Sequence, residues 1–233
     1  MSEAPVEGYD LVIVGAGASG VGCGIMAQRF GIDPARTLVL ERGAAAGSTF
    51  DQWPAEMRFI TPSFNQQAFG FMDLNSIAYD TSPAQLLHEQ HPTGIQYAEY
   101  LRKVAEDHAL PVAVETNVTA VTPLQHDAGE GFEVSVTQPR GAARKLPDRI
   151  RAKFVIWAAG EFQYPRADGF PGAEHCVHNS RVASWAELAE SSDERIVIGG
   201  YESGIDATVN LAAGCNVTLL ASTPFWAKRT LVK

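Results

Sequence analysis

A glycine-rich segment close to the N-terminus has the residue types and the spacing of a phosphate-binding turn. Gly15, Gly17 and Gly20 form the pattern Gly-x-Gly-x-x-Gly, with the small residues Ala18 and Ser19 between the last two. The first glycine permits a tight turn, the second a close approach of a pyrophosphate, and the third close packing of the following helix. The N–H groups and positive dipole end of that helix attract phosphates, and the Ser19 hydroxyl adds a donor. The segment therefore predicts a dinucleotide-binding turn.

The elements on either side of this turn are those that a dinucleotide site needs. The apolar run 9–14 predicts a strand, and the small residues 21–30 predict a helix. A second buried strand, 37–40, ends on Glu41, about twenty residues beyond the last glycine, where an acid accepts hydrogen bonds from a ribose diol. The alternative is a plain tight turn with a solvated Glu41, which the full order of elements disfavours. This unit by itself fits NAD and FAD equally, because both contain the same ADP half.

A second glycine-rich turn, near the C-terminus, repeats this order of elements. Residues 195–200 begin a predicted strand, turn and helix unit, which continues with a helix over 203–213 and another strand over 216–221. The residues expected to approach a nucleotide here are Gly199, Gly200, Ser203 and Gly204. Tyr201 stands at the middle-glycine position, where a side chain obstructs a pyrophosphate unless it points away. Glu202 would repel phosphate unless it turns to the ribose or the nicotinamide.

The end of the last predicted strand bears on which nucleotide would bind at this second turn. Ser222 and Thr223 follow the strand, at the place where an acid would bind the ribose 2′-hydroxyl of NADH. Lys228 and Arg229 lie downstream. Because hydroxyls and cations in place of an acid suit a 2′-phosphate, the sequence predicts NADPH in preference to NADH.

Between the two turns, one long irregular stretch precedes a series of regular elements. Residues 43–92 are rich in Gly, Pro, Asn and aromatic residues, and so long an irregular stretch is usually functional. Residues 96–108 predict an amphipathic helix. Its apolar face consists of Tyr97, Leu101, Val104 and Ala105. Three β-strands are expected after it, at 112–121, 131–137 and 154–157. Pro and Gly in the segment 166–172 indicate a domain boundary.

Further short motifs accompany the two turns in a fixed order. They are Glu41-Arg42, Gly47-Ser48-Thr49-Phe50, Ala158-Ala159-Gly160 with Phe162 and Pro165, His178-Asn179-Ser180 and the second turn up to Asp206. From Tyr9 through Asn210, this order resembles the two-dinucleotide-binding flavoproteins of the pyridine nucleotide-disulfide oxidoreductase superfamily. It is most similar to the flavin-containing monooxygenase type. The resemblance implies that the first turn binds FAD and that the second binds NADPH.

The fold class implied is α/β with two domains. A Rossmann-type FAD-binding domain, with a parallel sheet and additional β-strands, is expected over residues 1–168. A second Rossmann-type domain, for NAD(P), is expected over 169–233, and only its N-terminal part is present because the relatives continue further. Such a part would leave unpaired strand edges. Either the chain is a fragment, or a second chain, including a second copy in a homo-oligomer, supplies the missing strands.

The resemblance also implies further contacts to FAD. It places Thr49, Phe50 and nearby Trp53 along the flavin ring, where an aromatic side chain can pack on a flat ring system. It implies that the backbone of Val118 contacts the adenine. It also implies that Ala159 and Gly160 pass close to the cofactor, which small residues permit. An ordinary core position explains Trp53 equally well.

Composition disfavours several other classes of protein. The formal net charge of −9, with both signs interleaved, offers no basic stripe for nucleic acid or for an anionic membrane. No segment approaches the roughly 18 apolar residues of a membrane span. The 3 cysteines form no Cys-x-x-Cys pair, which disfavours a dithiol mechanism and suits a reducing, cytoplasmic compartment. His175, Cys176 and His178 lack a fourth ligand, so no metal site is expected.

The function that follows is an FAD-dependent oxidoreductase that accepts hydride from NAD(P)H and passes electrons to oxygen or a small organic substrate, as a monooxygenase does. No catalytic residue is recognisable, and Thr61, Ser63 and Asn65 are the polar candidates near the flavin motifs. The monooxygenase pattern Phe-x-Gly-x-x-x-His begins at Phe170 but has Cys176 in place of its histidine. The alternatives are a flavin-dependent reductase or oxidase without a stable peroxyflavin, and a non-catalytic flavin-binding partner or sensor.

Overall fold

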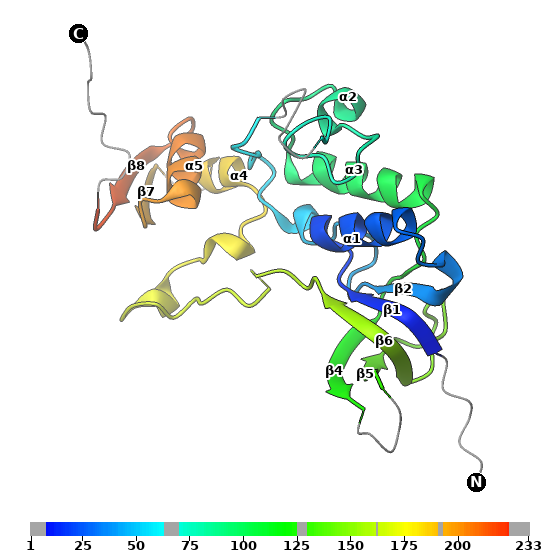
Figure 1. Cartoon of the computed structure of the whole chain (residues 1–233). Coiled ribbons are helices and arrows are strands. Elements are labelled where there is room, and N and C mark those ends of the chain that lie inside the picture. Colours follow the sequence, from blue (N-terminus) through cyan, green and yellow to red (C-terminus); the bar gives the residue numbers. More distant parts are fainter. Residues whose placement is uncertain (1–7, 63–69, 125–129, 162, 191–192, 224–233) are drawn as a thin grey trace. The chain divides into compact units, whose positions relative to one another are not determined.

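The chain divides into two units of unequal size. The computed structural model describes residues 8–62, 70–124, 130–161, 163–190 and 193–223 (Figure 1). The first unit comprises residues 1–51 and 59–164, and the second comprises 52–58 and 165–233. The second unit therefore begins at Pro165 and also takes in a short segment of the irregular stretch, for which the sequence contains no signal.

The first unit is built on a six-stranded sheet in the order β3-β2-β1-β6-β5-β4. Its strands are β1 (Gly8–Val14), β2 (Thr37–Leu40), β3 (Val112–Ala113), β4 (Asn117–Pro123), β5 (Phe132–Thr137) and β6 (Arg149–Trp157). Strands β3, β2, β1 and β6 pair in parallel, whereas β6, β5 and β4 pair antiparallel. A parallel sheet with antiparallel strands added confirms the predicted α/β class.

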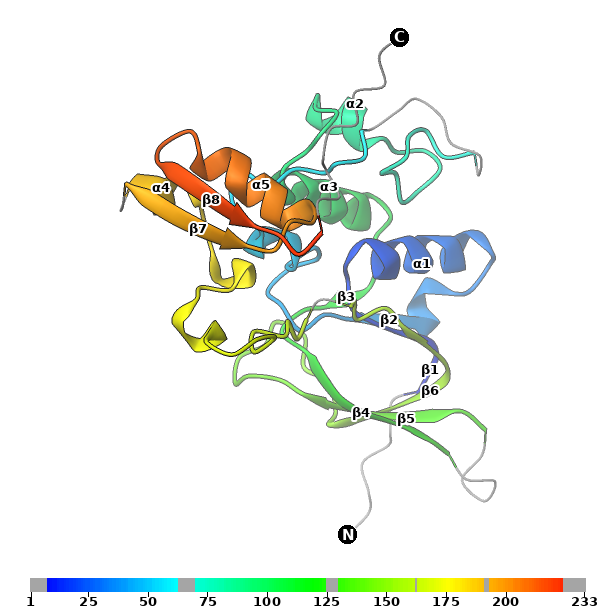
Figure 2. The same ribbon diagram turned by 90° about the vertical axis from the view of Figure 1, so that its left-hand side faces the viewer.

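Both faces of the parallel strands are covered, which explains why β1 and β2 are almost wholly apolar. On one face, Leu11 and Ile13 pack with residues of α1 (Ala18–Arg29) and α3 (Gly94–Asp107). On the other face, Val12 and Val14 pack with β5 and the first half of β6. Figure 2 shows α1 and α3 on one side of β1 and β2, and β4 and β5 on the other. The glycine-rich turn after β1 thus sits on a strand that is fixed from both sides.

The prediction of one strand over 112–121 is wrong, because this run forms two separate strands. β3 pairs with β2 at one end of the sheet, and β4 pairs with β5 at the other end. Between them, Glu115 has φ 51°, in the left-handed region, which interrupts the extended backbone. The alternation of apolar residues continues across this break, so the sequence pattern alone does not reveal it.

The helix α3 matches its prediction, and its first turn explains where it begins. Thr93 and Gln96 form a reciprocal capping box, in which each side chain accepts a hydrogen bond from the other's backbone N–H. The predicted apolar face is buried, with Tyr97 3% and Leu101 and Val104 0% exposed. The helix is therefore anchored on the core that also holds α1.

The irregular stretch between residues 70 and 92 is held on α3 by hydroxyl groups. Tyr97 Oη donates to the carbonyl of Asn75 at 2.8 Å, and Tyr100 Oη lies 2.7 Å from Thr81 Oγ1. Burial raises the pKa of both tyrosines, so both hydroxyls stay protonated, and Tyr100 Oη also accepts from the N–H of Ile77 at 3.1 Å. The described part of the stretch also contains the short helix α2 (Pro83–Leu87).

Two further elements are single 3-10 turns. They are η1 (Pro34–Arg36), in the first unit, and η2 (Phe50–Gln52), at the boundary between the units in the sequence.

The second unit contains one parallel pair of strands. β7 (Glu194–Ile198) and β8 (Asn216–Leu220) are joined by α5 (Glu202–Leu211), and α4 (Trp185–Glu190) precedes them. Two 3-10 turns, η4 (Ala173–His175) and η5 (Asn179–Arg181), lie before α4. The inward side chains of the strands pack with Trp185, which is 1% exposed. The outward side chains Ile196, Ile198 and Leu220 are more than half exposed, so one face of this pair is open within the unit.

Glu56 fastens the segment 52–58 to the second unit. Its Oε1 accepts from Ser184 Oγ at 2.6 Å and from the N–H of Ala186 at 3.1 Å, and its Oε2 accepts from the N–H of Trp185 at 2.9 Å. A carboxylate from a distant segment thus caps α4. Partial burial raises the pKa of Glu56, but these hydrogen bonds together outweigh burial and leave the pKa below its ordinary value.

Replacing Glu56 with glutamine should therefore destabilise the second unit by about 1 kcal/mol at neutral pH, the usual value of a helix cap. Because the pKa of Glu56 is lowered by folding, its contribution is present above the carboxyl's ordinary pKa and is lost as pH falls through the lowered one. The stability gap between wild type and Glu56→Gln should narrow below about pH 4. Urea unfolding at several pH values measures this, with Glu190→Gln, at an exposed position of α4, as the control. A gap that stays constant down to the lowest pH would contradict the assignment.

Candidate functional site

The first glycine-rich turn lies where the ends of three strands meet. Gly15 N–H donates to the carbonyl of Leu40 at the end of β2 at 2.7 Å, and Ala158 N–H donates to the carbonyl of Val14 at 2.8 Å. The turn between β1 and α1 is thereby flanked by the chain that leaves β2 and by the chain that leaves β6. In an open α/β sheet, the carboxyl ends of the strands are where ligands bind.

Two of the three glycines of this turn are required by the protein itself. Gly15 has φ 101°, and a Cβ on it would lie 2.9 Å from the carbonyl carbon of Ala158. A Cβ on Gly20 would overlap the carbonyl of Gly15, at 2.8 Å from its carbon atom. Any side chain at either position would force the turn apart.

The third glycine, Gly17, has no such structural reason. Its backbone is extended, with φ −75° and ψ −171°, and a Cβ built on it would meet no atom of the described residues within 4 Å. Gly17 is also the N-cap of α1, and no side chain caps the helix there. Neither the backbone conformation nor packing calls for glycine at this position, and the space in front of the helix N-terminus is open to a ligand.

Glu41 lies beside this turn, as predicted, but its carboxylate contacts the backbone. Oε2 accepts from the N–H of Ala16 at 2.7 Å, and Oε1 accepts from the N–H of Gly43 at 2.6 Å. A carboxylate offers about four lone-pair positions, so these bonds leave capacity for a ribose diol. Arg42, the neighbouring residue of the motif, is exposed.

Val118 approaches the same end of the sheet through the chain that precedes β4. The N–H of Thr116 donates to the carbonyl of Glu41 at 2.8 Å, and the N–H of Glu115 donates to the carbonyl of Gly43 at 2.9 Å. Val118 follows two residues later, half-buried against the core of the antiparallel strands. The structure therefore brings together Gly15–Gly20, Glu41, Val118 and Ala158–Gly160, residues that are far apart in the sequence.

The three residues predicted to lie along a flavin ring, Thr49, Phe50 and Trp53, differ from one another in burial and in the unit to which they belong. Phe50 is half-buried in an aromatic cluster, with its ring centroid 4.9 Å from that of Tyr97 and 5.8 Å from that of Phe59. Thr49 is exposed. Trp53 belongs to the second unit, whereas Phe50 belongs to the first. The cluster accounts for Phe50 as a core residue, which the sequence alone does not indicate.

The second turn repeats the backbone of the first. Gly199 has φ 112°, its N–H donates to the carbonyl of Leu220 at 2.9 Å, and a Cβ on Gly204 would lie 2.8 Å from the carbonyl carbon of Gly199. Tyr201 is the N-cap of α5, with φ −98° and ψ −171°, as Gly17 is of α1. The middle position is therefore in a conformation that any residue adopts, and the tyrosine side chain is 60% exposed there.

The surroundings of this second turn are acidic. Glu202 is exposed in the first turn of α5, beside Ser203. Burial, and then the charge of Glu202, raise the pKa of Asp206 one turn further along the helix. A Cβ on Gly200 would overlap that of Ala221, so this glycine also serves packing. The residues after β8, Ser222 and Thr223, are exposed, whereas Lys228 and Arg229 lie outside the described residues.

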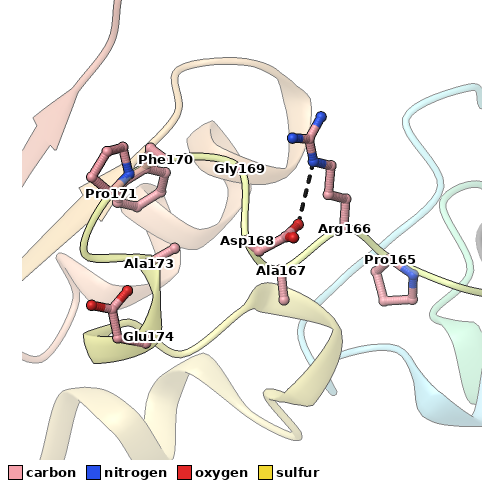
Figure 3. A pocket seen from close by; sticks show the side chains of 9 residues that line it. All are labelled: Pro165, Arg166, Ala167, Asp168, Gly169, Phe170, Pro171, Ala173 and Glu174. Atoms are coloured by element: carbon pink, nitrogen blue, oxygen red, sulfur yellow. Dashed lines mark hydrogen bonds and ion pairs between the residues drawn. The ribbon is translucent and has the colours of Figure 1, made fainter.

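The second unit also has a shallow hollow, which one continuous segment forms. Figure 3 shows its lining, from Pro165 to Glu174, with Arg166 and Asp168 paired at 3.3 Å. Both side chains of this pair are at least 80% exposed. No other described element contributes a group to the hollow, so the described residues offer no converging set of polar atoms of the kind that binds a small molecule.

The remaining candidates from the sequence lie only partly within the described residues. Thr61 is exposed, and Ser63, Asn65 and Phe162 lie outside the described residues. Across the ranges that the structure describes, no three His, Cys, Asp or Glu side chains are grouped as a metal site would require. The cysteines Cys23, Cys176 and Cys215 are all free thiols. None of the helices in these ranges is long and apolar enough to cross a bilayer.

Known proteins share this arrangement over most of the chain. A curated relative, the uncharacterized oxidoreductase CzcO of Bacillus velezensis, is 23% identical over 91% of this chain and 54% of its own length. The bacillithiol disulfide reductase Bdr (YpdA) of Staphylococcus aureus is 25% identical, with a TM-score of 0.68 over 92% of this chain and 57% of that one. A flavin-containing monooxygenase of Stenotrophomonas maltophilia is 19% identical, with a TM-score of 0.68 over 93% and 58%.

The chain thus spans little more than half the length of these proteins. The family model described as "Pyridine nucleotide-disulphide oxidoreductase" matches residues 12–232, from β1 to beyond β8. That range includes both glycine-rich turns and every element between them. The chain belongs to the pyridine nucleotide-disulphide oxidoreductase family of flavoprotein oxidoreductases.

Proposed function

We propose that the first unit binds FAD and that the second carries the beginning of a nucleotide site for NADPH, within an oxidoreductase that passes electrons to oxygen or to a small organic substrate. The observation that carries the proposal is Gly17. The fold requires Gly15 and Gly20, but none of the described residues requires a glycine at Gly17, which borders open space among them at a helix N-terminus. A pyrophosphate at this position would explain the glycine.

Other residues of the first unit support a dinucleotide at this turn, and the likeness to a flavoprotein favours FAD. Glu41 and the backbone near Val118 lie on one side of the turn, where a ribose and an adenine would extend. Ala158 to Gly160 lie on the other side, and Gly160 has φ 82°. The likeness to the flavin-containing monooxygenase of S. maltophilia, across 93% of this chain, agrees with a flavin at this place.

For the second turn, the proposal of NADPH rests on its likeness to the first turn and on the end of β8. The first and last glycines and the hydrogen bond to the end of the neighbouring strand are the same in both turns, whereas Tyr201 replaces the middle glycine. Ser222 and Thr223 follow the strand in place of an acid, which favours a 2′-phosphate. The pyridine nucleotide of the family description agrees with a nucleotide here.

When bound, FAD would supply the two-electron chemistry of such an enzyme. The residues of this chain would position it: α1 faces its N-terminus towards the pyrophosphate, and the small residues after β6 let the backbone approach. Glu41 would orient the ribose. Hydride transfer needs no acid or base from the protein, so the proposal assigns none.

The absorption spectrum of the purified full-length protein tests the first half of this proposal. We expect flavin bands that disappear on denaturation and release FAD, and we expect NADPH to bleach them in the absence of oxygen. A colourless protein that ignores added FAD would refute the FAD site. A flavin that NADPH and NADH both fail to reduce would favour a non-catalytic flavin-binding partner or sensor.

A reductase is the second candidate, and the likeness to the bacillithiol disulfide reductase Bdr favours it. Rapid mixing of the reduced protein with oxygen separates the two. A transient flavin–oxygen adduct band would support a monooxygenase, and its absence would support a reductase or an oxidase. In a reductase of this chain, the electrons would have to reach the acceptor without a cysteine pair, since Cys23, Cys176 and Cys215 are separate free thiols.

A further inference from the structure

Ala16, inside the first glycine-rich turn, is held by both of its backbone polar groups. Its N–H donates to Glu41 Oε2 at 2.7 Å, and its carbonyl accepts from the N–H of Gly47 at 2.9 Å. The residue itself is 0% exposed. Two hydrogen bonds therefore hold the middle of the turn to residues that follow β2. One comes from the Glu41 side chain and the other from the Gly47 backbone.

The backbone of Glu41 is also held by hydrogen bonds through both of its polar groups. Its N–H donates to the carbonyl of Ala113 at 2.9 Å, and its carbonyl accepts from the N–H of Thr116 at 2.8 Å. Its second carboxylate oxygen accepts from the N–H of Gly43 at 2.6 Å. The side chain thus bridges the glycine-rich turn and the loop after β2. It extends from a strand end whose backbone is hydrogen-bonded to the segment around β3.

We propose that Glu41 is a positioning residue for the phosphate-binding turn, in addition to being an acceptor for the ribose. By holding the N–H of Ala16, it fixes the Gly15–Ala16 peptide, while Gly47 holds the carbonyl of the next peptide, Ala16–Gly17. Glu41 thereby fixes the turn directly before the N–H groups of Gly17 and Ala18, and so helps to set the direction in which they point. The inference rests on the proposed nucleotide site at this turn. It differs from ribose binding, because it acts on the protein when no nucleotide is bound.

The chemistry of the position requires a carboxylate. Two backbone N–H groups, of Ala16 and Gly43, donate to the two oxygens, so both side-chain atoms must be acceptors. A glutamine has one oxygen, and its amide nitrogen would place donor against donor at the other contact. Glu41→Gln therefore keeps the size of the side chain but releases one of the two segments.

The test uses two nucleotides that differ in the ribose alone, ADP and 2′,3′-dideoxy-ADP, titrated calorimetrically into the full-length protein freed of nucleotide. We expect Glu41→Gln to weaken both nucleotides, each by about tenfold or more. Glu99→Gln, at an exposed position of α3, is the matched control and should weaken neither. If dideoxy-ADP binds equally to wild type and Glu41→Gln while ADP binds more weakly, Glu41 acts through the ribose alone and the proposal fails.

A second readout needs no nucleotide and separates this proposal from that of the FAD site. Hydrogen exchange of the backbone amides should show Ala16 and Gly43 protected in the nucleotide-free wild type. In Glu41→Gln, at least one of the two should exchange about tenfold faster or more, with the amides of β1 unchanged. Protection that is the same in both proteins overturns the proposal. If neither nucleotide binds to wild type, the FAD site is refuted and amide exchange alone decides the role of Glu41. If Glu41→Gln does not fold, the wild type alone decides. The proposal is overturned if the amides of Ala16 and Gly43 exchange as fast as unbonded loop amides, and it is supported if they are as protected as the amides of β1.

Discussion

The full-length protein with Gly17→Val should lose FAD while keeping its fold. A Cβ at this position meets no atom within 4 Å in the part of the chain that the structure describes, and φ −75° suits any residue. The folded state should therefore lose no more than about 1 kcal/mol. The valine side chain would instead occupy the space where the pyrophosphate approaches the N-terminus of α1. We expect FAD affinity to fall by at least about 100-fold, equivalent to about 2.7 kcal/mol. The flavin spectrum after dialysis and the melting temperature of the nucleotide-free protein measure the two effects separately.

Gly20→Ala is the comparison that gives this result its meaning. Its methyl group would overlap the carbonyl of Gly15 inside the turn, so we expect destabilisation of about 3 kcal/mol as well as loss of FAD. A Gly17→Val protein that stays yellow would mean that the pyrophosphate does not approach this turn. One that melts as early as Gly20→Ala would mean that Gly17 is needed by the fold after all.

Tyr201→Gly should strengthen NADPH binding by the full-length protein about tenfold, or about 1.4 kcal/mol. The two turns have the same glycine conformation, strand-end hydrogen bond and helix–turn packing, and they differ chiefly in the side chain at the middle position. Removal of the exposed ring opens the N-terminus of α5 as that of α1 is open. The dissociation constant for NADPH, measured by titration with the flavin oxidised, gives the effect.

Tyr201→Phe keeps the ring and should leave NADPH affinity unchanged, which makes it the matched control for Tyr201→Gly. Glu202→Gln removes a negative charge from the same helix turn and should strengthen NADPH binding. Because salt screens the repulsion between Glu202 and the phosphates, this gain in affinity should shrink as the salt concentration rises. If Tyr201→Gly binds NADPH more weakly than wild type, the ring contacts the nucleotide rather than obstructing it, and the tyrosine is part of the site.

Local sequence patterns were sufficient to predict those elements whose structure depends on the spacing of residues along the chain. The two turns follow from glycines between an apolar run and a helix, and α3 follows from its apolar periodicity, because a helix places residues three and four apart on one face. The position of Glu41 at a strand end is likewise a matter of distance from the last glycine. The family resemblance adds the expected cofactors, since the ADP half by itself does not distinguish them.

The tertiary structure decided what depends on partners distant in sequence. It split the run 112–121 at Glu115, placed Phe50 among other aromatic rings, and assigned residues 52–58 with Trp53 to the second unit through Glu56. No periodicity within a segment records which other segment will donate to a carboxylate or pack on a ring. For the glycine-rich turn, the sequence by itself predicted a phosphate site between β1 and α1. Only the fold showed that the protein needs Gly15 and Gly20, whereas a Cβ on Gly17 meets none of the described atoms, because that distinction rests on which atoms surround each Cβ.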